Sequence, residues 1–218
     1  MNPQPFADAA DASKDARIVF SAVTAAAAGE VARAAAGYLH PGQILLDVNS
    51  ASPRTKQTAA KIVGASGADY VEGAVMAAVA GPGLRVPILA GGPAAASAAD
   101  ILDGLGMNLT PVTVEAVRAA ATKLARSIVM KGIEAALIQS MEAARRWSVE
   151  REGLQSLQHT YPGIAWATLV QSCTERVAKH GRRRAQEMRE AGEMLEDLGL
   201  DPGLGGAIAA AQEQGAKP

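Results

Sequence analysis

The feature that most constrains the fold is a long helical pattern in the middle of the chain. Residues 115–148 contain no proline, and apolar residues recur there at helical spacing. At 1.5 Å per residue this segment makes a rod of roughly 50 Å, which is too long for a crossover helix in an α/β sheet. The chain of 218 residues is long enough for two modest domains, so this helix is predicted to lead from one domain into another.

Before the long helix, short apolar runs alternate with helical segments. The predicted strands are residues 17–23, 44–50, 69–75, 85–92 and 107–112, and the predicted helices are residues 24–37, one opening at Pro53, and 93–105. A βαβαβ run of this kind implies a parallel sheet with right-handed crossovers. We therefore predict an α/β fold: a partial Rossmann-type parallel sheet over residues 1–113, followed by an all-helical domain over residues 114–218, where helical patterns continue with short breaks.

Composition excludes several classes of partner. The 21 basic and 22 acidic residues give no strong field for nucleic acid or an anionic membrane, and Cys173 alone forms no intrachain disulfide. No apolar run approaches the roughly 20 residues that span a bilayer, and the N-terminus lacks the order of a signal peptide. No two histidines have metal-ligand spacing. We expect a soluble cytoplasmic protein without a metal.

Polar residues at the end of a predicted strand form the first part of a candidate site. Asn49 and Ser50 follow a buried strand and precede a helix capped at Ser52. Ligands of parallel sheets bind at the carboxyl ends of the strands, where such side chains lie. The alternative is that Ser52 is only an N-cap and Asn49 only a turn residue.

The long helix contributes a polar stripe on an otherwise apolar surface. Lys123, Ser127, Lys131 and Glu134 fall within about 80° of one another on a helix of 3.6 residues per turn. Because an unpaired buried ammonium is costly, the stripe must face a groove, a partner or water. We assign Lys123 to the candidate site, and Lys131 to an ion pair with Glu134 at helical spacing.

Three motifs in order along the chain give it a resemblance to a known family. They are RIVFSAVTA from Arg17, DVNSASP from Asp47 and TKLARS from Thr122. With them the chain resembles the β-hydroxyacid dehydrogenase superfamily, which includes 3-hydroxyisobutyrate and 6-phosphogluconate dehydrogenases and imine reductases. It looks closest to the branch with its own helical C-terminal domain.

The resemblance implies roles for individual residues. Val23 and Thr24 would lie beside the nicotinamide of NAD or NADP, and Asn49 and Ser50 would bind substrate. Lys123 takes the place of the family's catalytic lysine. Ser127, a second substrate-binding residue, stands where the family usually has Asn.

The chain also departs from the family pattern. Met76, Ala77 and Ala78 replace the family's Ser-Gly-Gly substrate loop. No G-x-G-x-x-G motif lies between a strand and a helix, and Gly81-Pro82-Gly83 is interpreted as a turn. The family's first strand, glycine loop and first helix have no counterpart before residue 1, which leaves open a truncated product, a mis-started reading frame or a degenerate homologue. NAD or NADP binding is therefore expected to be weak.

The resemblance implies an NAD(P)-dependent oxidoreductase acting on the CH–OH group of a small hydroxy acid. Two alternatives stay open. One is a non-catalytic dimerising remnant, and the other is an imine reductase, against which Lys123 argues because the lysine position is often not lysine there. We also expect a homodimer built mainly on the helical domain, because half a Rossmann sheet exposes an edge and the long apolar helix needs cover.

Overall fold

The computed structural model describes residues 4–216, which form two compact units. The first unit ends at Lys123 and the second begins at Leu124, inside the long helix. The sequence pattern places the domain boundary ten residues earlier, after residue 113, where the last strand of the sheet ends. Each unit has the type of structure that the sequence predicts: a sheet with helices in the first, and helices alone in the described part of the second.

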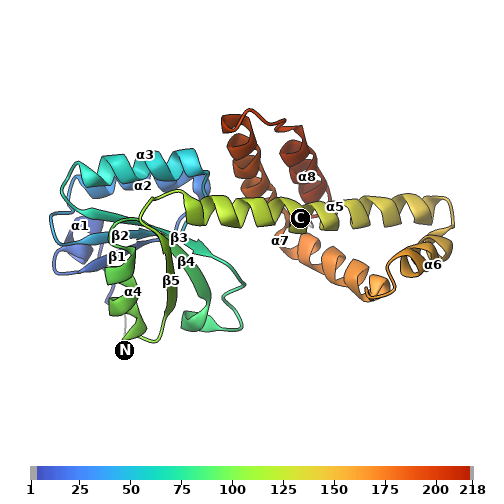
Figure 1. The fold of residues 1–218 in the computed structure, drawn as a ribbon, viewed down its shortest axis with the longest axis horizontal. Helices are drawn as coiled ribbons and strands as arrows, with labels where there is room; N and C mark the ends of the chain where they lie inside the picture. Colours follow the sequence, from blue (N-terminus) through green and yellow to red (C-terminus); the bar gives the residue numbers. More distant parts are fainter. Residues whose placement is uncertain (1–3, 217–218) are drawn as a thin grey trace. The chain divides into compact units, whose positions relative to one another are not determined.

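The first unit contains a sheet of five strands and the helices that connect them (Figure 1). The strands are β1 (Ile18–Ser21), β2 (Ile44–Asp47), β3 (Asp69–Val75), β4 (Pro87–Gly91) and β5 (Asn108–Thr113). The helices are α1 (Ala9–Ser13), α2 (Ala25–Ala36), α3 (Pro53–Gly64), the short 3-10 helix η1 (Gly83–Arg85) and α4 (Ala95–Asp103). The strands lie side by side in the order in which they occur along the chain.

The direction of the strands changes once within the sheet. β1, β2 and β3 are parallel, as the βαβαβ pattern predicts. β4 is antiparallel to β3, and β5 is parallel to β4, so the sheet is mostly but not entirely parallel. The reason lies in the connection: the segment 76–86 between β3 and β4 holds only the short 3-10 helix η1, whereas a parallel crossover needs a dozen or more residues and usually a helix.

Each face of the sheet is covered by helices, because successive side chains of a buried strand point to opposite sides. Leu45 and Tyr70 pack with α2 and α3 on one face. Leu46 and Val71 pack with α4 on the other. The β2 strand is buried at all four positions, as expected for a strand between two helical layers.

The second unit consists of helices. α5 (Arg118–Arg146) enters it from the first unit and is followed by α6 (Glu150–Thr160), α7 (Trp166–Asp197) and α8 (Gly203–Gln214). Leu137 and Met141 of α5 pack against Val170 and Cys173 of α7. α7 and α8 approach so closely that a Cβ on Gly181 would lie 2.2 Å from the carbonyl oxygen of Gln212. Among the described residues, no helix has the length and apolar character needed to cross a membrane.

Candidate active site

Lys123 and Ser50 meet in the first unit. Lys123 lies in the first turns of α5, and Ser50 lies in the segment between β2 and α3. The Lys123 Nζ donates a hydrogen bond to the Ser50 Oγ at 2.5 Å, and both side chains are half-buried. The structure thus brings together two residues that the sequence assigns to one site although they are separated by 73 positions.

Asn49, the neighbour of Ser50, joins the ends of β1 and β2. Its Oδ1 accepts a hydrogen bond from the backbone N–H of Val23 at 2.5 Å, and its Nδ2 donates to the Ser21 Oγ at 2.9 Å. The residue is buried, so these contacts replace hydration of its amide. Asn49 therefore shapes the loop after β1, and its contact with a substrate stays a prediction.

The loop held by Asn49 ends at the N-terminus of α2. Val23 and Thr24 are exposed, and Thr24 is the N-cap residue of α2 without a side-chain capping hydrogen bond. The first N–H groups of a helix have no partner within the helix and favour polar or anionic groups. The two residues predicted to contact a cofactor thus lie beside polar backbone groups.

A buried polar cluster that the sequence pattern does not predict supports the end of β2. Lys56 of α3, 1% exposed, has its Nζ 2.8 Å from Asp47 Oδ1 and 2.9 Å from the Asp47 carbonyl oxygen. The Tyr70 hydroxyl donates to Asp47 Oδ2 at 2.7 Å, and the Asn49 N–H donates to Asp47 Oδ1 at 2.9 Å. Burial, reinforced by the Asp47 carboxylate, raises the pKa of Tyr70 well above its usual value, so its hydroxyl stays a donor. The signal in the sequence was an acidic residue within a buried strand.

Glu72 on β3 binds the start of α5. Its Oε1 accepts the N–H of Ala119 at 2.8 Å and its Oε2 accepts the N–H of Ala120 at 3.1 Å. The residue is fully buried. Burial raises the pKa of its carboxyl group above the usual value, although the two N–H groups and the charge of Lys56 act in the opposite direction.

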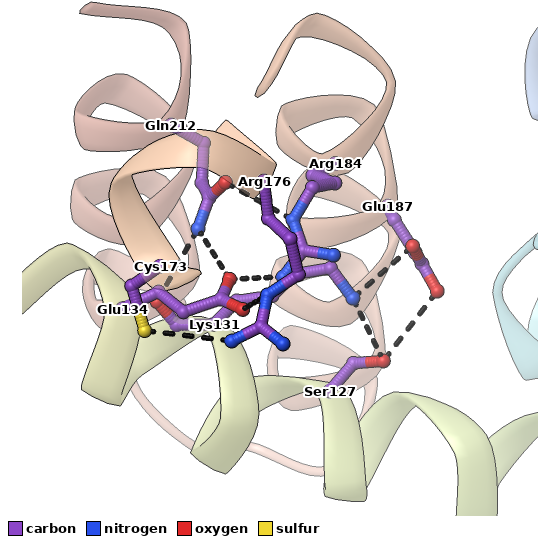
Figure 2. A network of polar contacts seen from close by, with 8 residues as sticks. All are labelled: Ser127, Lys131, Glu134, Cys173, Arg176, Arg184, Glu187 and Gln212. Atoms are coloured by element: carbon purple, nitrogen blue, oxygen red, sulfur yellow. Dashed lines mark hydrogen bonds and ion pairs between the residues drawn. The ribbon is translucent and has the colours of Figure 1, made fainter. Parts of the chain in front are cut away.

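Ser127 and Lys131 belong to a polar cluster of the second unit (Figure 2). The Lys131 Nζ lies 3.1 Å from Glu187 Oε2 and donates to the Ser127 Oγ, also at 3.1 Å. The Ser127 hydroxyl donates to Glu187 Oε1 at 3.4 Å. Burial lowers the pKa of Lys131, while the Glu187 carboxylate counteracts that shift. Lys131 is in an ion pair as expected, but the partner is Glu187 of α7 rather than Glu134.

Glu134 pairs with arginines instead. Its carboxylate contacts the guanidinium groups of Arg184 and Arg176, the latter at 3.2 Å. The Gln212 Nε2 of α8 donates to the same carboxylate at 3.2 Å. The cluster therefore connects α5, α7 and α8, and it satisfies a buried carboxylate that would otherwise be costly. The pairing of Lys131 with Glu134 is wrong because partners on α7 reach both side chains.

The connection between β3 and β4 contains the glycine-rich segment. Gly81-Pro82-Gly83 forms a turn that leads through η1 into β4, as predicted, and Gly83 has a φ of 58°. Met76, Ala77 and Ala78 lie in the same connection, directly after β3. Among the described residues no group of three histidine, cysteine or acidic side chains could hold a metal ion.

The chain forms a mostly parallel sheet covered on both faces, followed by a long helix that continues into an all-helical unit. This fold matches that of proteins similar in structure to 3-hydroxyacid dehydrogenases. A family model described as a domain of unknown function (DUF1932) matches residues 144–214. The crystal structure of a conserved hypothetical protein from Sinorhizobium meliloti 1021 matches this chain with a TM-score of 0.80. The two sequences are 37% identical, and the match covers 94% of this chain and 68% of that chain. The match to this relative and the fold show that the chain belongs to the β-hydroxyacid dehydrogenase superfamily, which confirms the resemblance.

Two further solved structures have the same fold. MTH1747, a conserved protein of unknown function reported to be similar in structure to 3-hydroxyacid dehydrogenases, is 28% identical over 95% of this chain and 78% of its own, with a TM-score of 0.76. Mycobacterium tuberculosis 3-hydroxyisobutyrate dehydrogenase with L-serine is 15% identical over 96% of this chain and 77% of its own, with a TM-score of 0.72, and supports the fold alone. A search of curated proteins gave no match.

Proposed function

We propose that this chain is an NAD(P)-dependent oxidoreductase that acts on the CH–OH group of a small hydroxy acid. The observation that supports this most is the contact of the Lys123 ammonium with the Ser50 hydroxyl at the carboxyl end of β2. In an α/β sheet this edge is where ligands bind, and the exposed Val23 and Thr24 lie at the end of the neighbouring strand.

When bound, NAD or NADP would supply the hydride chemistry, and the residues of the chain would position the substrate and handle the proton. The Lys123 Nζ would donate a proton to the carbonyl oxygen during reduction, or accept one from the hydroxyl group during oxidation. Ser50, at hydrogen-bonding distance from that nitrogen, would orient the same oxygen of the substrate. Asn49 would hold the Val23 backbone in place through the hydrogen bond described above.

The residues present fit only part of a dinucleotide. The α2 N-terminus at Thr24 offers N–H groups to a polar ligand. The sequence contains no G-x-G-x-x-G motif that would hold a pyrophosphate. As the family resemblance implies, Val23 and Thr24 would contact the nicotinamide side of the cofactor. The substrate-binding role of Ser127 stays a prediction, since its hydroxyl binds Lys131 and Glu187 in this structure.

The test is turnover of small 2- and 3-hydroxy acids, with L-serine among them, at saturating NAD or NADP. Lys123→Met should lower kcat by about 10²- to 10⁴-fold, the usual size of general acid/base assistance, with cofactor binding little changed. Lys131→Met, assayed at a temperature where it is folded, should cost much less. Equal losses in the two variants would contradict the proposal. Turnover of imines would instead favour the imine reductase alternative, and a folded protein without turnover of either class would favour the non-catalytic remnant.

A further inference from the structure

The start of α5 lacks the residue type that normally caps a helix. The N–H of Ala121 donates to the carbonyl oxygen of Val117 at 3.0 Å, which makes Val117 the N-cap residue. An N-cap side chain usually accepts hydrogen bonds from the second or third N–H group of the helix, and valine has no acceptor. These are the N–H groups of Ala119 and Ala120, and both donate to Glu72 of β3. A residue 47 positions away thus replaces the local cap.

The same contact fixes where the sheet holds the helix. Glu72 pairs with Gly91 in the β3–β4 ladder, and a Cβ on Gly91 would lie 2.6 Å from Glu72 Oε1 and 2.7 Å from the Glu115 carbonyl oxygen. Only a glycine at this position leaves room for both the carboxylate and the segment that enters α5. A capping residue on α5 itself would stabilise the helix but would not attach it to β3.

β3 also anchors the other half of the proposed site. Tyr70 lies two residues before Glu72, on the same face of the strand, and its hydroxyl binds Asp47. Asp47 in turn accepts the N–H of Asn49, the residue before Ser50. One short stretch of β3 therefore holds both the segment carrying Ser50 and the helix carrying Lys123.

We propose that Glu72 is a positioning residue, which fixes the first turn of α5 on the sheet so that the Lys123 Nζ lies against Ser50. Lys123 follows Ala119 by one helical turn, so a rotation or shift of that turn displaces its side chain directly. The catalytic consequence rests on the proposed function of Lys123, whereas the placement of the lysine does not.

The first experiment measures Glu72→Gln with two independent readouts. The amide keeps the shape of the side chain but offers one acceptor oxygen in place of two, so one of the two N–H groups loses its partner. We expect the rate of trace acetylation of Lys123, measured by mass spectrometry against Lys179 as an internal reference, to rise severalfold. We expect kcat to fall by about 10- to 100-fold with the KM for the cofactor unchanged, because small misplacements of catalytic groups cost this much.

The second experiment separates positioning from helix capping. Val117→Ser supplies a local N-cap, so the double variant Glu72→Gln/Val117→Ser should regain the hydrogen-exchange protection of residues 118–123. Under our proposal it should not regain the low acetylation rate of Lys123 or the lost kcat, because the attachment to β3 is still weakened. If the single variant is unfolded, the double variant is compared with Val117→Ser alone.

Three results would overturn the inference. They are an unchanged acetylation rate of Lys123 in Glu72→Gln, full restoration of that rate by Val117→Ser, and full restoration of kcat by it. A failure of the proposed function would give a different result. Lys123→Met would then keep its activity, while the acetylation rate of Lys123 would still rise in Glu72→Gln.

Discussion

Gly192 of α7 and Gly205 of α8 pack backbone against backbone. A Cβ atom on Gly205 would lie 2.9 Å from the Cα of Gly192 and 3.0 Å from the carbonyl oxygen of Met188. The relationship is not symmetric, because a Cβ on Gly192 would lie 3.6 Å from the carbonyl oxygen of Pro202, an ordinary contact. At this contact the close approach of the two helices therefore depends on Gly205 of α8 and not on Gly192 of α7.

The two glycines give a matched pair of variants for stability. Gly205→Ala should lower the free energy of unfolding of the second unit by about 1–3 kcal/mol, since the backbones must move apart. Gly192→Ala should be neutral or stabilising by up to about 1 kcal/mol, because alanine favours the helix and its Cβ would make only an ordinary van der Waals contact. Urea denaturation followed by tryptophan fluorescence reports this unit, as Trp147 and Trp166 both lie in it. Equal effects of the two substitutions would contradict the asymmetry.

The ion pair of Lys131 and Glu187 predicts a second stability effect. Lys131→Met removes the cation that neutralises a buried carboxylate, and breaking a buried pair in this way costs about 3–5 kcal/mol. Lys131→Met/Glu187→Gln should recover part of that loss, because no uncompensated charge then remains at position 187. The double variant is compared with both single variants by urea denaturation. A double variant less stable than Lys131→Met would contradict the prediction that the uncompensated charge of Glu187 causes the loss.

Glu72 predicts a dependence of stability on pH. Burial raises the pKa of its carboxyl group above the usual 4.5, against the lowering effect of two backbone N–H groups and Lys56. As pH rises from that value, the unfolded chain releases this proton first, so the folded state binds more protons and stability falls, by at most about 1.4 kcal/mol per pH unit. Glu72→Gln should remove this fall between pH 4.5 and the raised pKa. The check is hydrogen exchange of the first unit across that range, and an unchanged slope in the variant would contradict the assignment.

Cofactor affinity should be weak in the 218-residue chain. No glycine loop is present in this sequence to bring N–H groups and a helix dipole to the pyrophosphate. Calorimetric titration with NADH and with NADPH should therefore give dissociation constants weaker than the low micromolar range. Low micromolar binding would mean that another element of the chain holds the phosphates.

We predict that the chain forms a homodimer, mainly through the second unit. On α5 the side chains of Val129, Met130 and Ile133 are each more than 40% exposed, which is unusual for neighbouring apolar residues of a monomer. Light scattering at micromolar concentration should give the mass of a dimer, and Ile133→Glu should shift it towards the monomer. Leu105→Glu, at an exposed apolar residue of the first unit, is the control and should leave the mass unchanged. A monomeric mass for the unmodified chain would contradict the prediction.

The elements that could be predicted from the sequence are those with a local pattern. The apolar run 69–75 coincides with β3, and Pro53 opens α3 as predicted because proline suits the first turn of a helix. The direction of β4 was missed, since a strand pattern is the same in both directions. Its only local signal was the short connection after β3.

The candidate site, too, could be predicted from the sequence only where its residues lie in a local pattern. Lys123 and Ser50 could be paired because each lies in a family motif, and the structure places them in contact. Glu72 could not be found, because the N–H groups it binds lie 47 residues away or more and a single acidic residue in a strand gives no sign of its partner. Lys131 was assigned the wrong partner for a related reason: helical spacing favoured Glu134, whereas Glu187 is reached only through the packing of α7.

The order of the five strands has a consequence for how the molecule is made. Each strand pairs with the strand that precedes it in the chain, so the sheet can be extended in the order of synthesis. Among the described strands, the sequence separation of pairing residues is therefore smaller than it would be in a sheet with a rearranged strand order. The exception is the start of α5, which comes to Glu72 only after β4, α4 and β5 have been added. On the ribosome, the site around Lys123 would therefore be completed after the sheet that supports it.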